Sequence, residues 1–294
     1  MDPRFSPHNT HRESVGEFAK RDPNLRQMIK LPLPYRSPLL DRLKLLGAGV
    51  YSLTGGRQIG KTTVLKQWMA ELLKSGTDPE RICYLAGELI DDHHTLVRLI
   101  TEQVAEWEGR GPGYLLVDEV TYIREWDKGV KFLADAGTLE DIVLMLSGSD
   151  SALIQEARMR FPGRRGASSI VDFHIGPLTF SEYVDLAKRI PTAGRQSLLA
   201  PKRSITESTR RLVDAEFLRY LAHGGFLRAI NDMALGDSIL PSTFATYGDW
   251  IRGDMLKRGK QEHYLREILA AIAGRYGTQV TWNALSRDLS IDHP

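Results

Sequence analysis

The chain has 294 residues, of which 42% are hydrophobic, 39 are basic and 37 are acidic, giving a formal net charge of +2. This hydrophobic content supports a sizeable core and excludes a disordered chain, and the length allows one or two domains. The near-balanced charge neither requires nor excludes a nucleic-acid partner. The single cysteine, Cys83, excludes a disulfide within the chain and indicates a reducing, cytoplasmic setting.

The first part of the chain carries no signal for export. Residues 1–30 lack the apolar stretch of a signal peptide, and no apolar run in the sequence reaches transmembrane length. Because residues 1–30 are polar and contain three prolines, we expect a weakly ordered lead-in. A proline-rich, extended segment follows at 31–38. Its Tyr35 either stacks on a nucleotide base or belongs to a plain packed linker.

Residues 49–175 alternate between short apolar runs and helical patterns. Such alternation predicts βαβ units and a parallel sheet with right-handed crossovers. The predicted strands are 50–54, 82–86, 114–118, 142–147 and 170–175, and the predicted helices between them are 61–75, 94–108, 126–136 and 150–158. We therefore expect a three-layer α/β/α domain with a parallel sheet over residues 31–190.

A glycine-rich loop follows the first predicted strand. Residues 55–62 match G-x-x-x-x-G-K-[ST], the phosphate-binding loop, between an apolar run and a helical pattern. Backbone N–H groups of such a loop and the N-terminus of the next helix bind phosphate. Lys61 is expected to reach the β- and γ-phosphates and the Thr62 hydroxyl to bind Mg²⁺. The predicted nucleotide-binding residues of this loop and helix are Gly55, Gly56, Arg57, Gln58, Ile59, Gly60, Lys61, Thr62 and Thr63.

Two adjacent carboxylates, Asp118 and Glu119, end the third predicted strand. In an open α/β sheet, the carboxyl ends of the strands form the ligand-binding edge. Asp118 is therefore predicted to bind Mg²⁺, and Glu119 is predicted to act as the catalytic base that deprotonates an attacking water. The alternative for this pair is an acidic helix start without a catalytic role.

Later residues supply further catalytic candidates. Ser147 follows the fourth predicted strand, and its hydroxyl either touches the γ-phosphate or the attacking water or lies in a turn that caps the next helix. Four arginines lie between residues 158 and 165. Among them Arg164 is a candidate arginine finger, acting in cis or in a neighbouring subunit. The alternative for these arginines is a solvated basic loop or a contact with nucleic-acid phosphates.

The sequence changes character after residue 190. Residues 191–206 are predicted to be a mobile connection, and residues 207–258 a helical lid from which Arg228 reaches the nucleotide. Residues 259–294 resemble the start of a winged-helix or helix-turn-helix region. Since the chain ends where a third helix would follow, we expect it to be truncated.

The ordered set of motifs resembles prokaryotic AAA+-type P-loop ATPases. In the nearest group, the ATPase domain precedes a helical lid, a winged helix and often a nuclease-like C-terminal domain. The resemblance covers about residues 30–290, and the segments that carry it are 55–63, 115–119, 146–149, 163–164, 176–183 and 224–225. It implies ATP and Mg²⁺ as ligands, with Lys61, Thr62 and Asp118 binding them and Glu119 as the catalytic base. Two positions depart from the family pattern, because Ser147 replaces a threonine and Phe226-Leu227 replaces an aromatic–proline step.

The leading functional hypothesis is a Mg²⁺-dependent ATP hydrolase that serves as a switch or motor module. An alternative is an ATP-binding regulatory or DNA-docking module with little turnover, suggested by the partial helix-turn-helix pattern and the arginines at 158–165. A GTPase or small-molecule kinase is a further enzyme class, although the Asn-Lys-x-Asp pattern of guanine recognition is absent from the sequence. The expected partners are ATP and ADP, DNA through the C-terminal winged-helix region, and a second copy or a partner protein; no membrane partner is expected.

Overall fold

The computed structural model describes residues 1–107, 109, 111–149, 154, 171–198, 206–257, 259, 261–275, 277–287, 289 and 290. Five strands form a fully parallel sheet in the order β2-β3-β4-β1-β5. They are β1 (Gly49–Gly55), β2 (Ile82–Ala86), β3 (Gly113–Asp118), β4 (Ile142–Gly148) and β5 (Asp172–Ile175). All five predicted strands are confirmed to within two residues at either end. The predicted helix at 150–158 falls almost wholly outside the described residues.

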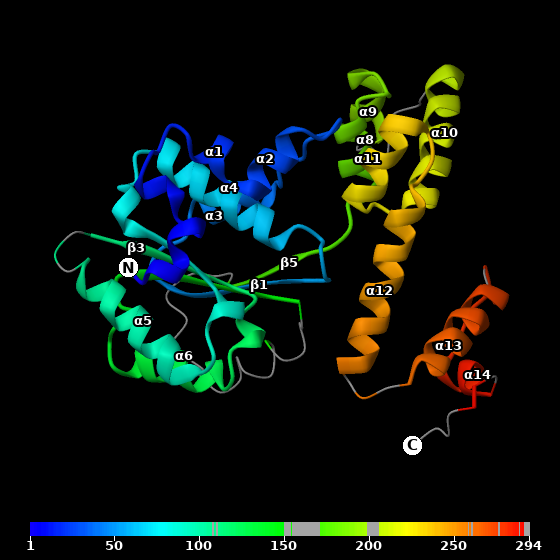
Figure 1. The fold of residues 1–294 in the computed structure, drawn as a ribbon. Helices are drawn as coiled ribbons and strands as arrows, with labels where there is room; N and C mark the ends of the chain where they lie inside the picture. Colours follow the sequence, from blue (N-terminus) through cyan, green and yellow to red (C-terminus); the bar gives the residue numbers. More distant parts are fainter. Residues whose placement is uncertain are drawn as a thin grey trace. The chain divides into compact units, whose positions relative to one another are not determined.

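Helices cover both faces of this sheet because apolar side chains alternate along its buried strands (Figure 1). In β4, for example, Leu144 belongs to one core and Met145 to the other. On the Met145 face lie α1 (Phe18–Arg21), α2 (Pro23–Ile29), α3 (Leu39–Leu43) and α4 (Lys61–Lys74), and on the Leu144 face lie α5 (His93–Ala105) and α6 (Trp126–Asp135). Short 3₁₀ turns connect them, namely η1 (Pro3–His8), η2 (Thr10–Arg12), η3 (Pro79–Arg81), η4 (Gly87–Leu89) and η5 (Val120–Tyr122). The predicted three-layer α/β/α architecture is confirmed.

Residues 1–30 are packed against the α/β layers, so the prediction of a weakly ordered lead-in is wrong. Phe5 is 0% exposed and Phe18 is 1% exposed, and they belong to the cores on opposite faces of the sheet. Asn9 is buried beside β2, where its side-chain amide donates to Tyr84 O and its Oδ1 accepts the Tyr84 N–H, both at 2.8 Å. These isolated apolar residues have no sequence periodicity of their own, because the cores they complete are built by other elements.

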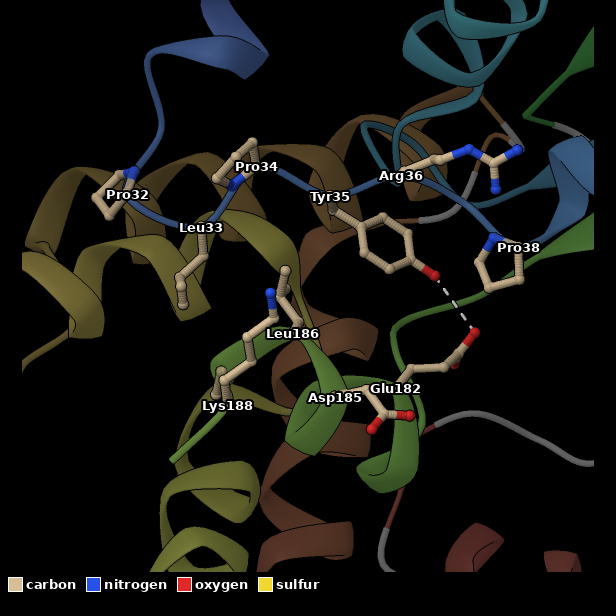
Figure 2. A pocket seen from close by; sticks show the side chains of 11 residues that line it. Pro32, Leu33, Pro34, Tyr35, Arg36, Pro38, Glu182, Asp185, Leu186 and Lys188 are labelled. Carbon is tan, nitrogen blue, oxygen red and sulfur yellow. Dashed lines mark hydrogen bonds between the residues drawn. The ribbon is translucent and has the colours of Figure 1, made fainter. Parts of the chain in front are cut away.

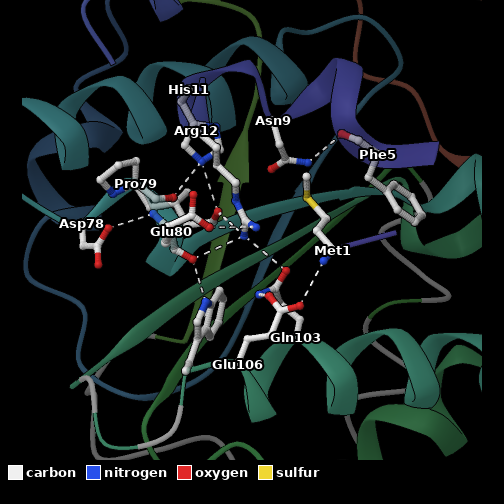
Figure 3. Close-up of polar contacts among 12 residues, drawn as sticks. Met1, Phe5, Asn9, His11, Arg12, Asp78, Pro79, Glu80, Gln103 and Glu106 are labelled. Atoms are coloured by element: carbon white, nitrogen blue, oxygen red, sulfur yellow. Dashed lines mark hydrogen bonds and ion pairs between the residues drawn. The ribbon is translucent and has the colours of Figure 1, made fainter. Parts of the chain in front are cut away.

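Further polar contacts of the lead-in reach the segment before β2 and the helix α5 (Figure 3). His11 Nε2 lies 3.2 Å from Pro79 O and 3.1 Å from Ile82 O. Arg12 Nη2 donates to Gln103 Oε1 at 3.2 Å. Burial lowers the pKa of His11 to about 4, so the imidazole is neutral at pH 7 and donates from Nε2 to the two carbonyl oxygens.

A third apolar cluster lies beyond β5 and includes residues of α8 (Phe180–Ala187), α10 (Glu207–His223) and α11 (Leu227–Gly236), while α9 (Thr192–Leu198) follows α8 along the chain. The buried residues of this cluster are Leu178, Tyr183, Val184, Ile190 and Ile230. Thr179 and Glu182 form the reciprocal capping box that starts α8. Helix α9 occupies residues that were predicted to be a mobile connection, so that prediction is wrong for 192–198, while 199–205 lie outside the described residues.

The chain divides into two compact units, residues 1–234 and residues 235–294. The second unit contains α12 (Pro241–Lys257), α13 (Glu262–Gly274) and α14 (Trp282–Ser286). The lid predicted over 207–258 is therefore divided between the two units, and the winged helix stays a prediction. Among the described residues, no helix has both the length and the apolar character needed to cross a membrane.

The buried imidazole of His11 predicts a loss of stability in acid. Its folded-state pKa of about 4 lies below the ordinary value of 6.5, so the unfolded chain binds more protons between these pH values. The free energy of unfolding is expected to fall as the pH drops from about 6.5 to about 4, by up to about 3 kcal/mol from this group. His11→Gln keeps a hydrogen-bond donor but does not titrate. Its free energy of unfolding, measured by urea denaturation, should therefore depend less on pH than that of the wild type. His263→Gln, at an exposed histidine, is the control; equal pH slopes for all three proteins would contradict the assignment.

Candidate functional site

The phosphate-binding loop joins β1 to α4. Gly60 has φ of +102°, a left-handed conformation that favours glycine, and it immediately precedes Lys61, the first residue of α4. Gly55 lies beside β5, where a Cβ atom would be 2.4 Å from Ile175 O. Gln58 also has a positive φ, +49°. The remaining predicted residues, Gly56, Arg57, Ile59, Thr62 and Thr63, complete this loop and the first turn of α4.

The Lys61 side chain is 3% exposed and lies over the loop. Its Nζ donates to Gly55 O at 3.2 Å and to Gly56 O at 3.0 Å. The same Nζ lies 3.4 Å from Glu119 Oε1. The ammonium group therefore connects the loop after β1 with the carboxylate that follows β3.

Asp118 is 4% exposed and accepts hydrogen bonds on both carboxylate oxygens. Oδ2 accepts from Thr62 Oγ1 and from the Tyr84 hydroxyl, each at 2.6 Å. Oδ1 accepts from Ser147 Oγ and from the backbone N–H of Glu119, the latter at 3.1 Å. Four donors from α4, β2, β4 and the end of β3 thus fix one carboxylate.

The strand order explains why Ser147 takes part in this arrangement. Strand β4 lies between β1 and β3, so the polar end of β4 separates the phosphate-binding loop from the two carboxylates. The structure brings Lys61, Thr62, Asp118, Glu119 and Ser147 together through the contacts given above. Ser147 Oγ contacts Asp118 and the Glu119 N–H. The helix that was predicted to follow Ser147 lies almost wholly outside the described residues, so both alternatives for this side chain stay predictions.

Glu119 differs from Asp118 in exposure and in backbone conformation. Its side chain is 23% exposed, and its φ of +49° turns the chain sharply after β3. Ser149 Oγ donates to Glu119 Oε2 at 3.3 Å. A carboxylate that is held by polar neighbours yet reached by solvent is suited to accept a proton from water.

Two residues of the site were not predicted from the sequence. Tyr84 was overlooked because a tyrosine within a strand is ordinary, and only the pairing of β2 with β3 places it beside Asp118. Gly87 follows β2, and a Cβ atom there would lie 2.6 Å from Glu119 O and 2.7 Å from Asp118 O. The glycine therefore permits the close approach of the chain to the carboxylate pair.

The remaining predicted contacts are less closely tied to this centre. Arg228 lies exposed in the first turn of α11, and its contact with a nucleotide stays a prediction. Arg164 and the other arginines of 158–165 lie outside the described residues, so the arginine finger and the DNA contact of that loop also stay predictions. The Tyr35 side chain points into a cavity of about 480 Å³ between the 31–38 segment and α8, where its hydroxyl donates to Glu182 at 3.3 Å (Figure 2).

The donor set at Thr62 and Asp118 fits a magnesium ion. A hydroxyl and a carboxylate are hard oxygen donors, which Mg²⁺ prefers. The described residues contain no group of three or more His, Cys, Asp or Glu side chains able to hold a metal ion. Most ligands of an ion at this place would therefore come from phosphate oxygens and water, as is usual for Mg²⁺ bound with a nucleotide.

Comparison with known families agrees with this geometry. Residues 48–184 match the sequence profile of a family described as AAA domain. Residues 48–184 are therefore similar to AAA domains, and we call this segment the AAA domain. The matched segment runs from the start of β1 into α8 and contains the phosphate-binding loop, the carboxylate pair and Ser147.

A curated protein that is described as uncharacterised is similar to this chain. This protein of Haemophilus influenzae is 26% identical over 247 residues, which cover 81% of this chain and 54% of the relative. The chain thus spans about half the length of the curated relative that it matches.

Solved structures similar to this chain include three archaeal proteins. A Walker-type ATPase of Pyrococcus abyssi is 14% identical, with a TM-score of 0.49 over 85% of each chain. The ORC2 protein of Aeropyrum pernix in its ADP form is 15% identical, with a TM-score of 0.44 over 90% of this chain and 82% of that one. Cdc6p of Pyrobaculum aerophilum is 15% identical, with a TM-score of 0.41 over 87% of this chain and 79% of that one.

Gly87→Ala is expected to disturb the carboxylate pair. The added methyl group would press on the carbonyl oxygens of Asp118 and Glu119, and overpacking of this kind typically costs about 1–3 kcal/mol. Chemical denaturation should show this loss. Gly47→Ala is the matched control, because a Cβ atom there meets nothing within 4 Å. Equal stability of the two variants would contradict the close approach.

Proposed function

We propose that the AAA domain binds ATP together with Mg²⁺ at the ends of β1 and β3 and hydrolyses the γ-phosphate. The observation that carries this proposal is the convergence of Lys61, Thr62, Asp118 and Glu119 from a phosphate-binding loop and a neighbouring strand end. A lysine, a hydroxyl, a buried carboxylate and a more exposed carboxylate are the groups that phosphoryl transfer to water requires.

The phosphate-binding step uses the loop and Lys61. The carbonyl oxygens of Gly55 and Gly56 now accept from the ammonium group. A triphosphate on the loop would offer charged oxygens in their place, and hydrogen bonds between charged groups are stronger than those to carbonyls. Lys61 would then turn toward the phosphates and release its contact with Glu119.

The magnesium site uses Thr62 and Asp118, which are already joined by a hydrogen bond of 2.6 Å. When bound there, Mg²⁺ neutralises charge that develops on the β- and γ-phosphate oxygens. Asp118 stays fixed by Tyr84 and Ser147, so little reorganisation of the carboxylate is needed.

The hydrolytic step is assigned to Glu119. Once Lys61 has turned away, Glu119 Oε1 is available to accept the proton of an attacking water. Ser149 holds the other oxygen, Oε2. The buried Ser147 hydroxyl contacts the Glu119 backbone N–H at 3.2 Å and keeps the turn after β3 in place.

The cavity beside Tyr35 is the proposed place for the nucleotide base. Its volume of about 480 Å³ is typical of small-molecule sites, and the aromatic ring offers a stacking surface. Gln67 Nε2 donates to Tyr35 O at 2.8 Å, which ties this segment to the helix that begins at Lys61. Asn231 of α11 accepts the Leu33 N–H at 2.9 Å. A ligand in the cavity would therefore also affect the position of α11. This linkage supports a role as a nucleotide-dependent switch or motor module.

Lys61→Ala is expected to weaken ATP binding at least tenfold. The substitution removes charge-assisted hydrogen bonds to phosphate, which are worth about 1.5–3 kcal/mol each. Isothermal titration calorimetry with a non-hydrolysable ATP analogue measures the change. Lys74→Ala, at the exposed end of the same helix, should bind like the wild type. Unchanged affinity of the Lys61 variant would refute the phosphate contact.

Glu119→Gln is expected to retain ATP binding while lowering single-turnover hydrolysis by about 10²–10⁴-fold, the usual contribution of a general base. The amide cannot accept the proton of water at neutral pH. Glu88→Gln changes an exposed carboxylate in the nearby turn η4 and serves as the control. A hydrolysis rate equal to that of the wild type would remove Glu119 from the mechanism.

A further inference from the structure

A buried lysine lies behind the candidate magnesium site. Lys66 of α4 is 1% exposed, although lysine is almost never fully buried without a partner. Its partners come from the lead-in, since Nζ donates to His8 O at 2.6 Å and lies 3.5 Å from Asp22 Oδ2. Asp22 itself is 2% exposed. An ion pair is thus enclosed between α4 and residues that carry no catalytic motif.

The enclosed ammonium also lies on the ring of Tyr84. Lys66 Nζ is 3.6 Å from the ring centroid, well within the range of a cation–π contact. The backbone of Tyr84 is held by Asn9 through two hydrogen bonds of 2.8 Å. The ring and main chain of this tyrosine are therefore both fixed by contacts to residues 8–22 or to the lysine that those residues enclose.

The other end of Tyr84 reaches the magnesium site. Its hydroxyl donates to Asp118 Oδ2 at 2.6 Å, the same oxygen that accepts from Thr62. Burial raises the pKa of Tyr84, and the Asp118 carboxylate acts in the same direction. The hydroxyl therefore keeps its proton and serves only as a donor to Asp118.

A purely structural role does not require charges at this place. Replacing a buried ion pair by apolar side chains of similar volume is often neutral or stabilising, so the Lys66–Asp22 pair is poor evidence for stability. Hydrogen bonds to a metal-binding carboxylate, by contrast, orient it and tune its affinity for the metal. Tyr84 is the residue that joins the lead-in to Asp118 by hydrogen bonds and ring contacts, and the Lys66 charge also acts on Asp118 through space.

We propose that Tyr84 is a positioning residue for Asp118, and that the lead-in, through Asp22 and Lys66, holds Tyr84 in the position that magnesium binding requires. This inference rests on the proposed function, because it assigns residues outside the phosphate-binding loop to the same magnesium–nucleotide site. It makes residues 8–22 part of that site although none of them belongs to the phosphate-binding loop or to the carboxylate pair.

The test compares the magnesium dependence of nucleotide binding in single variants of the full chain. Calorimetry with a non-hydrolysable ATP analogue, in Mg²⁺ and in EDTA, gives the factor by which Mg²⁺ tightens binding. Tyr84→Phe removes only the hydroxyl and is expected to reduce this factor by about 10–100-fold, with binding in EDTA unchanged. Tyr51→Phe is the control, because that buried hydroxyl donates to Gly47 O at the opposite end of the sheet.

The outcomes separate this inference from the proposed function. A Tyr84→Phe protein with the wild-type magnesium factor overturns the inference and leaves the proposed function standing. Equal losses in Tyr84→Phe and Tyr51→Phe also overturn it, because they indicate a general effect on the sheet. A wild type that binds no nucleotide in either buffer overturns both.

A second comparison tests the contribution of the lead-in. Asp22→Asn removes the charge while the amide can still cap α2, as the carboxylate now does through the N–H groups of Asn24 and Leu25. It is expected to reduce the magnesium factor several-fold in the wild-type background and not at all in a Tyr84→Phe background, since coupled residues are not additive. An equal reduction of the magnesium factor by Asp22→Asn in both backgrounds would show that Asp22 acts independently of the Tyr84 hydroxyl, and would overturn this part of the inference.

Discussion

The buried carboxylate of Asp118 is the constraint on which the candidate site depends. Its four donors come from α4, β2, β4 and its own backbone neighbour, so they meet only if three strands are in the correct register. Asp118 pairs with Ala86 of β2, and Leu146 of β4 pairs with Val117. A slip of β3 by one residue would turn the carboxylate to the other face of the sheet. The geometry of the site therefore depends directly on the register of the sheet.

Such a fully bonded carboxylate is stable only while all its partners are present. In a low-dielectric interior each satisfied hydrogen bond is strong, and each lost one leaves a costly unpaired group. One of the four donors to Asp118 is the Tyr84 hydroxyl of β2, a strand that carries no recognised nucleotide motif. The lead-in holds β2 through the hydrogen bonds of Asn9 with the Tyr84 backbone. The α/β domain and the first 30 residues thus form one packing unit around the site.

The sequence was sufficient for the sheet and for the convergence of the glycine-rich loop and the carboxylate pair at one edge of it. Continuous apolar runs ending in Asp118 or Ser147 have few conformations other than a buried strand, and the pattern after Gly60 has the spacing of a helix. The contribution of the lead-in was not predictable in this way. Phe5 and Phe18 are separated by polar residues, and Lys66 has the appearance of an ordinary helix-surface lysine until its neighbours Asp22 and His8 are placed. Likewise, helix α9 lies in a segment whose Pro, Gly and Ser content is typical of a connection, where tertiary packing outweighs composition.

The position of β1 in the sheet has a consequence for how the chain folds during synthesis. β1 is made first, yet its neighbours β4 and β5 begin only at residues 142 and 172. While β2 and β3 can pair as soon as they leave the ribosome, β1 must wait without a strand on either side, a situation in which incomplete chains tend to aggregate. The loop that precedes α4 can therefore reach its final surroundings only after β5 has emerged, since Gly55 lies beside Ile175, and a nascent chain halted earlier would lack one side of that loop.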